Sequence, residues 1–330
     1  MVKTAQFEEA GRLITENRSM LVLGHQYPDG DAIGSVLALS MMLKAAGKEV
    51  QASWPEPFDI PEKYRFLPGM ELLVRPKDIS WEVGLTIALD CANARRLDDL
   101  EERSLAGPAI NIDHHPDNTL FATANIVDSQ ASATSEIVYR AAGPFGLSLD
   151  KDIAVCLYTG IVTDTGRFQF SNTTFETLRI AGDLVELGVK PHVIYHSVYQ
   201  SDSLEYLRLS GEVLCRAVYD CELGLIYGYV SRQDLASFGV KMNETEDLID
   251  NLRALRGHKV AALLKELPEG NVRVSLRSRV DVDIGSVARR LGGGGHKVAA
   301  GYTSEKRSIS EAVAELKGEI IASGWGTDSK

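Results

Sequence analysis

Short strand-like segments alternate with helix-like segments through the first half of the chain, and this alternation restricts the fold more than any other feature. The strand-like runs are residues 20–23, 49–54, 85–89 and 109–112. Helical periodicity marks the segments around them: 5–18, 32–46, 133–142 and 151–163. Strands separated by helices predict a mostly parallel sheet with helices on both faces. In such α/β folds the ligand site lies at the carboxyl ends of the strands.

The second half of the chain predicts a smaller α/β domain. Residues 175–220 read as mostly helical, and one helix over 194–218 would connect the two domains. Strand-like segments follow at 224–230 and 272–279, with helices between and after them. We expect the substrate to bind in the cleft between the two domains.

The length of the chain supports this division. It has 330 residues, and single hydrophobic cores stop growing at about 250–300 residues. The expected boundaries are a first domain at 1–190, a helical connector at 191–220 and a second domain at 221–330.

The charge of the chain excludes one class of nucleic-acid-binding protein. The formal net charge is −11 and the pI is about 5.2, whereas proteins that coat long nucleic acid carry a strong basic bias. We therefore expect no binding to long duplexes. A small anionic substrate is compatible with this charge, because a metal ion and a few arginines can hold phosphates locally.

The cysteine pattern and the start of the chain predict a cytoplasmic protein. The four cysteines form no CxxC pair and no zinc-type cluster: Cys91, Cys156, Cys215 and Cys221. The opening residues lack the apolar core of a signal peptide. No run of about 18 apolar residues occurs, so neither a transmembrane helix nor a membrane partner is expected.

Carboxylate and imidazole side chains follow four of the apolar segments. They are His25, Asp29 and Asp31 after the first strand, Asp90 after the third, Asp113, His114 and His115 at the end of the fourth, and Asp164 after the helix-like run 151–163. An aspartate after a strand is usually a cap or turn residue, whereas the adjacent pair His114 and His115 behind Asp113 is harder to explain in that way. Four such groups at one edge of a sheet are not explained as separate cap or turn residues. Like charges gathered there would repel strongly, and a pair of divalent cations would remove the repulsion.

The segments that carry these residues resemble the four motifs of the DHH phosphoesterase superfamily, in the same order. They read GHQYPDGDAIGS, ALDCAN, NIDHHPDN and TGIVTDTGRFQFSN. The stretch SLRSRVDVDIGSVARRLGGGGHKVAAGY resembles the companion DHHA1 domain. The resemblance therefore spans nearly the whole chain, and it implies a parallel-sheet DHH domain with a smaller α/β DHHA1 domain across a cleft.

The resemblance also implies a set of metal ligands. His25 and Asp29 would hold one ion, Asp31, His114 and Asp164 would hold another, and Asp90 would bridge the two. His115 would lie beside the site, contact the substrate and protonate the leaving oxygen. Mixed histidine and carboxylate ligands suit Mn²⁺, Co²⁺, Fe²⁺ or Zn²⁺ better than Ca²⁺. Two divalent ions are expected, with Mn²⁺ favoured and Co²⁺, Fe²⁺ or Mg²⁺ as alternatives.

A run of glycines in the second domain is the remaining signal. Gly293, Gly294 and Gly295 precede His296, and glycines with exposed backbone amides can cradle a phosphate. Arg279 ends the strand-like segment at 272–279 and would add charge. The resemblance points the same way, since it assigns substrate binding to this domain.

Within the superfamily, the two-domain length resembles the bacterial oligoribonuclease and pAp phosphatase group (pAp is 3′-phosphoadenosine 5′-phosphate). Such an enzyme would cut short RNA to 5′-mononucleotides and convert pAp to AMP and phosphate. Four alternatives stay open: a cyclic or linear dinucleotide phosphodiesterase, a RecJ-like single-strand exonuclease, a manganese pyrophosphatase, and a non-catalytic nucleotide sensor. A homodimer is compatible with the sequence.

Overall fold

The computed structural model describes residues 4–80, 82–279, 282–295 and 297–324. The chain divides into two compact units, and the division falls between Ser201 and Asp202. This point lies inside the segment 191–220 that the sequence marks as a connector. Each unit has its own sheet and its own hydrophobic core.

The sheet of the first unit is parallel throughout, as predicted. Its strands are β1 (Ser19–Leu23), β2 (Glu49–Ser53), β3 (Leu85–Leu89), β4 (Ala109–Asp113) and β5 (Ala124–Val127). Their order across the sheet is β2-β1-β3-β4-β5. The short edge strand β5 is an addition that the sequence analysis did not include. The α/β class and the positions of the other four strands are confirmed.

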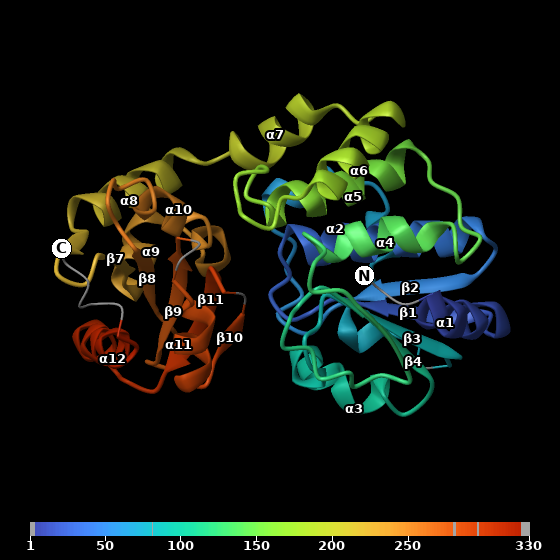
Figure 1. Ribbon diagram of the computed structural model, residues 1–330, viewed down its shortest axis with the longest axis horizontal. Coiled ribbons are helices and arrows are strands. Elements are labelled where there is room, and N and C mark those ends of the chain that lie inside the picture. Colours follow the sequence, from blue (N-terminus) through green and yellow to red (C-terminus); the bar gives the residue numbers. More distant parts are fainter. Residues whose placement is uncertain (1–3, 81, 280–281, 296, 325–330) are drawn as a thin grey trace. The chain divides into compact units, whose positions relative to one another are not determined.

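The two faces of this sheet are covered differently (Figure 1). Helices that contribute buried residues to the main core include α1 (Thr4–Glu16), α2 (Gly30–Ala45), α4 (Thr134–Ala142), α5 (Lys151–Asp164) and α6 (Phe175–Glu186). The opposite face is covered by α3 (Glu101–Ser104) and by 3₁₀ turns, including η3 (Pro76–Asp78) and η4 (Ala94–Leu100). The helix α7 (Pro191–Tyr199) closes the unit, and the turns η1 (Glu62–Tyr64) and η2 (Met70–Leu72) lie between β2 and β3.

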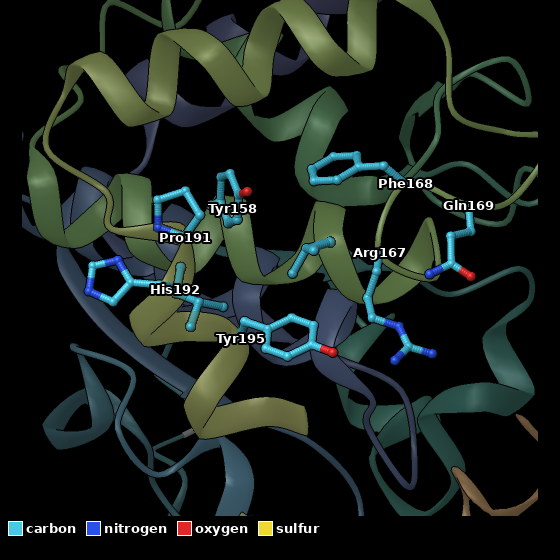
Figure 2. Close-up of a pocket in the computed structure, with 9 residues that line it drawn as sticks. Tyr158, Arg167, Phe168, Gln169, Pro191, His192 and Tyr195 are labelled. Atoms are coloured by element: carbon cyan, nitrogen blue, oxygen red, sulfur yellow. The ribbon is translucent and has the colours of Figure 1, made fainter. Parts of the chain in front are cut away.

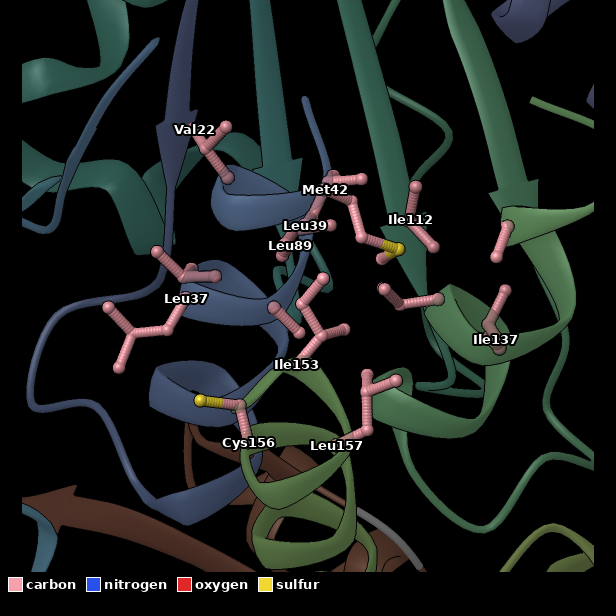
Figure 3. Close-up of a cluster of buried hydrophobic side chains, with 14 of the residues drawn as sticks. Val22, Leu37, Leu39, Met42, Leu89, Ile112, Ile137, Ile153, Cys156 and Leu157 are labelled. Carbon is pink, nitrogen blue, oxygen red and sulfur yellow. The ribbon is translucent and has the colours of Figure 1, made fainter. Parts of the chain in front are cut away.

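The helix α5 packs so closely against α2 and α4 that two positions require glycine. A Cβ atom at Gly34 of α2 would lie 2.5 Å from the carbonyl oxygen of Cys156 in α5. One at Gly160 of α5 would collide with the hydroxyl of Ser135 in α4 and lie 2.7 Å from Oδ1 of Asp31 in α2. Buried side chains from β1, β3, β4 and these helices interdigitate in the core beneath (Figure 3). This close approach brings the start of α2 and the end of α5 together.

The second unit is built on a mixed six-stranded sheet of order β10-β11-β9-β8-β7-β6. Its strands are β6 (Val218–Asp220), β7 (Leu225–Val230), β8 (Val260–Glu266), β9 (Val272–Ser278), β10 (Gly294–Gly295) and β11 (Ala299–Ser304). Its helices are α8 (Leu204–Cys215), α9 (Arg232–Phe238), α10 (Leu248–Leu252), α11 (Ile284–Arg290) and α12 (Ile309–Ala322), with the 3₁₀ turn η5 (Met242–Thr245).

Two details of the predicted second half are wrong. The single helix expected over 194–218 is interrupted, because Ser203 caps α8 by accepting a hydrogen bond from the Tyr206 amide at 3.1 Å. The segment between the two predicted strands contains the strand β8 in addition to helices. Its sequence VAALLKE is rich in Ala and Leu, which favour helices. In this fold its six buried residues place it inside the sheet instead.

Among the described residues, none of the helices is both long enough and apolar enough to span a membrane.

Candidate metal centre

The acidic and imidazole residues singled out in the sequence lie together in the first unit. Asp90 directly follows β3, and the chain leaves β4 through Asp113 into His114 and His115. Asp29 caps α2, whose first turn carries Asp31, and Asp164 is the last residue of α5. Within each of three overlapping groups the ligand atoms lie within 4.8 Å of one another: His25, Asp29 and Asp90; Asp31, His114 and Asp164; Asp90, His114 and His115.

Asp90 stands at the middle of the cluster. Its Oδ2 lies 3.4 Å from Nε2 of His25, and its Oδ1 lies 3.6 Å from Nε2 of His114. The same Nε2 of His114 is 3.5 Å from Oδ2 of Asp164. The side chains of Asp90, His25 and His114 are almost completely buried. Asp90 also has a positive φ of 59°, a conformation that non-glycine residues adopt mostly where the surroundings enforce it.

Each of the two inner histidines is oriented through its other ring nitrogen. Nδ1 of His25 lies 2.8 Å from the carbonyl oxygen of Gln26, and Nδ1 of His114 lies 3.4 Å from that of Ala131. A proton on Nδ1 donated to a backbone carbonyl leaves the Nε2 lone pair facing the carboxylates. Metal-binding histidines are typically held in this way.

His115 has a different environment. Its Nδ1 lies 2.7 Å from Oδ1 of Asp113, whose other oxygen accepts a 2.6 Å hydrogen bond from Asn118. Burial alone would lower the pKa of His115, but the charge and hydrogen bond of Asp113 and the charge of Asp90 raise it to about 10. Asp113 therefore orients His115. It belongs to none of the three groups of possible metal ligands described above.

The amino end of α4 supports the cluster, which the sequence analysis missed. The backbone amides of Thr134 and Ser135 donate to the two oxygens of Asp31 at 2.6 and 2.9 Å. The Thr134 hydroxyl donates to Oδ1 of Asp90 at 2.9 Å. The signal that could have revealed this was the run SATSE at the start of α4, because Ser and Thr are typical of helix starts.

Two sequence families match the chain. "DHH family, N-terminal domain" matches residues 19–161, and "DHHA1 domain" matches residues 223–322. The Bifunctional oligoribonuclease and PAP phosphatase NrnA of Thermus thermophilus is 36% identical over 305 residues, which are 91% of this chain and 90% of the relative. This chain belongs to the DHH family of phosphoesterases.

Solved structures show the same fold. An exopolyphosphatase-related protein from Bacteroides fragilis superposes with a TM-score of 0.88 at 25% identity, covering 98% of this chain and 97% of that one. RecJ of Thermus thermophilus, solved in complex with Mn²⁺, superposes with a TM-score of 0.55 at 14% identity. The match covers 97% of this chain and 55% of RecJ.

The donor set of the DHH unit fits divalent cations on electrostatic grounds. Burial and then the charges of Asp90 and Asp29 raise the pKa of Asp31 well above its usual value. The pKa of Asp164 is also raised well above its usual value, by burial and then by the charges of Asp31, Asp29 and Asp90. Carboxylates gathered so tightly cannot all stay ionised without positive charge among them. Divalent cations would supply that charge, and histidine nitrogens beside carboxylate oxygens suit a transition metal.

In the DHHA1 unit the glycine run has a structural role. Gly294 and Gly295 form β10, which pairs with β11, and the Gly293 amide donates to the carbonyl of Ala288 at 2.8 Å. A Cβ atom at Gly293 would collide with the carbonyl oxygen of Gly301. Close backbone packing therefore accounts for Gly293 without a ligand. His296 lies outside the described residues.

An arginine that lies nearer to the glycines of β10 in the sheet than Arg273 does is Arg277, which was not singled out from the sequence. Arg277 lies within β9 and pairs with Ala299 of β11, on the strand face that it shares with Ser275. Arg279 is exposed beyond the end of β9, with its backbone amide bonded to the carbonyl of Lys259 at 3.1 Å. The two positions share one face by strand alternation, and the end of β9 at Ser278 is what separates the two arginines.

Proposed function

We propose that this DHH phosphoesterase hydrolyses short oligoribonucleotides to 5′-mononucleotides and converts pAp to AMP and phosphate. The observation that carries the proposal is the buried cluster around Asp90, whose donor atoms form three overlapping groups. The name of the Thermus relative, 36% identical over most of both chains, states both activities and supports the choice of substrate.

In this proposal His25 and Asp29 would hold one divalent ion. Asp31, His114 and Asp164 would hold a second, and Asp90 would be a ligand of both. When bound, such ions activate water for attack on phosphorus and stabilise the negative charge that develops on the phosphoryl oxygens. Mn²⁺ is the favoured metal, because histidine nitrogens beside carboxylate oxygens suit a transition metal.

Residues of the chain itself position the metal ligands and supply a proton to the leaving oxygen. The hydroxyl of Thr134 and the first amides of α4 fix the carboxylates of Asp90 and Asp31 in place. His115 holds a proton because Asp113 and Asp90 favour its charged form. With Nδ1 bound to Asp113, Nε2 is the ring atom from which His115 can protonate the leaving oxygen.

Substrate phosphates beyond the reacting one are assigned to the DHHA1 unit. Arg279, His296 and the glycines Gly293, Gly294 and Gly295 keep that proposed role, and Arg277 joins them because of its place on β9. Arginine suits phosphate because its planar guanidinium can donate two parallel hydrogen bonds.

The test is a substrate panel with the purified chain and Mn²⁺: pAp, the dinucleotide pApA, a five-nucleotide RNA, a 24-nucleotide RNA, pyrophosphate and a cyclic dinucleotide. We expect turnover of pAp, pApA and the five-mer, with the 24-mer cut at least tenfold more slowly because the acidic surface repels a long polyanion. Equal rates on the long RNA would indicate a processive exonuclease. Turnover of pyrophosphate alone would contradict the proposal and indicate a pyrophosphatase. Turnover of the cyclic dinucleotide alone would contradict it and indicate a cyclic dinucleotide phosphodiesterase.

A further inference from the structure

A pocket of about 390 Å³ lies wholly within the DHH unit and is unused by the mechanism above. Three segments line it: the end of α5, the loop that follows it, and the start of α7 (Figure 2). The one histidine in its lining, His192, is exposed. Its lining combines aromatic rings with a few polar groups, which is the usual composition of a small-molecule site.

Aromatic rings from all three segments surround the pocket. Tyr158 comes from α5, Phe168 from the loop and Tyr195 from α7. The Phe168 ring meets Tyr158 edge to face, with centroids 6.0 Å apart and planes at 71°. Tyr195 is 41% exposed, so part of its surface is available to a ligand. Such rings stack on any nucleobase, because every base offers a π face.

The polar groups in the pocket complement the edge of a base. The guanidinium carbon of Arg167 lies 5.0 Å from the centroid of the Tyr199 ring, and the Arg167 Nε is buried without a hydrogen-bond partner among the described residues. Gln169 is exposed beside it and offers an amide donor and acceptor. A buried donor without a partner is unfavourable, and a ligand with acceptor atoms would satisfy it.

The loop holds these side chains in a fixed backbone conformation. Gly166, Arg167 and Phe168 all have positive φ angles, of 54°, 66° and 63°. The hydroxyl of Thr165 accepts from the Phe168 amide at 3.1 Å and donates to the carbonyl of Ile161 at 2.6 Å. Successive left-handed residues persist only where surrounding contacts enforce them, and such strain is concentrated at functional sites.

The same loop is tied to the metal cluster. Asn172 donates to the carbonyl oxygens of Asp164 and Ser132, at 3.1 and 2.9 Å. Val162 lines the pocket, whereas Asp164, two residues further along α5, belongs to the cluster. Two residues are about 200° apart around a helix, so pocket and cluster lie on different sides of the last turn, about 10 Å apart.

We propose that this pocket binds a nucleobase of the substrate whose phosphate lies at the metal cluster. The inference rests on the proposed function, and it adds a place in the DHH unit where nucleotides are distinguished from other phosphoesters. Stacking on Tyr195 and Phe168 supplies affinity for any base, and Arg167 and Gln169 bind its edge.

Binding is tested with adenosine, which lacks a phosphate, using saturation-transfer NMR on the EDTA-treated protein and ribose 5-phosphate as the ligand without a base. The variants are Tyr195→Ala and Arg167→Met. The matched control is Val193→Ala, which removes an exposed side chain of α7 that does not line the pocket. We expect adenosine to bind wild type and control, and each pocket variant to bind about tenfold more weakly, the loss typical of one stacking contact. Equal binding by all four proteins, or no binding by wild type, overturns the inference.

Turnover of pApA with Mn²⁺ separates failure of the pocket from failure of the proposed function. We expect KM to rise about tenfold in both pocket variants while kcat changes less than twofold. Unchanged KM beside normal wild-type turnover refutes the pocket alone, and absent wild-type turnover refutes the function. If Tyr195→Ala leaves KM unchanged but dissociates a dimer on size-exclusion chromatography, the surface belongs to a second copy of the chain and the inference is wrong.

Discussion

The hydroxyl of Thr134 donates a 2.9 Å hydrogen bond to Oδ1 of Asp90, although the two residues are 44 positions apart in the chain. Both side chains are buried, so the bond fixes the carboxylate at the centre of the cluster. Thr134→Val keeps the shape of the side chain and removes the donor. We expect Mn²⁺ affinity, measured by calorimetry, to fall about tenfold, as for other groups that orient metal ligands.

The control for this change is Thr15→Val, whose exposed hydroxyl bonds only to the Gly11 carbonyl of its own helix among the described residues. It should leave Mn²⁺ affinity unchanged. Wild-type affinity in Thr134→Val would show that Asp90 is positioned without this bond.

Asp164 makes stability depend on pH in a defined direction. Its pKa is raised well above 3.8 by burial and by neighbouring carboxylates, so the folded, metal-free protein holds this proton more tightly than the unfolded chain. The stability that this proton contributes is fully present at a pH below the usual carboxyl pKa. It is lost as the pH rises through the raised pKa of the folded protein, and the loss is about 1.4 kcal/mol per unit by which the pKa is raised. Asn cannot ionise, so Asp164→Asn should gain stability over wild type as pH rises. Urea unfolding in EDTA at pH 5 and pH 9 measures this, and a difference that shrinks toward pH 9 contradicts it.

Gly293 should be far more sensitive to substitution than Gly318, another glycine of the DHHA1 unit. A Cβ there would collide with the backbone of β11, whereas one at Gly318, exposed in α12, would meet nothing within 4 Å. We expect Gly293→Ala to lower the free energy of unfolding by about 1–3 kcal/mol. Gly318→Ala should raise it by up to about 1 kcal/mol, because Ala favours helices. Denaturant titration of both variants gives the answer, and equal effects would mean that β10 is not packed as described.

The two arginines near the end of β9 should contribute unequally to substrate binding. Arg277 lies within the strand, beside β11, while Arg279 extends beyond its end. Loss of a charge-assisted hydrogen bond costs about 1.5–3 kcal/mol, or roughly ten- to a hundredfold in kcat/KM. We expect Arg277→Ala to lose this much on pApA and Arg279→Ala to lose less, with bound Mn²⁺ unchanged in both. A larger loss of kcat/KM in Arg279→Ala than in Arg277→Ala would make Arg279 the main phosphate contact.

The sequence predicted the first sheet well because its strands are short apolar runs that end in polar residues. Leu23 and Leu89 close such runs, and His25 and Asp90 follow within two residues. Parallel strands share one carboxyl edge, so residues distant in sequence meet there. The convergence of His25, Asp90 and His114 follows from that geometry together with the motif order.

Contacts that depend on tertiary packing were not predictable in this way. Thr134 looks like any helix-start residue until α4 is placed against Asp90. The strand β8 was missed because Ala and Leu carry a helical preference that burial in the sheet overrides. The pocket beside Tyr195 requires α7 to fold back against the loop after α5, and no local pattern records that contact.

The central claim is that the cluster binds two divalent ions that share Asp90, and equilibrium dialysis against Mn²⁺ tests it most directly. The wild-type chain should bind about two ions. Asp90→Ala, confirmed as folded by circular dichroism, should bind at most one with affinity reduced at least a hundredfold, because it loses the donor at the middle of the cluster. A wild-type chain that binds no Mn²⁺, or an Asp90→Ala variant that still binds two ions at wild-type affinity, would contradict the account.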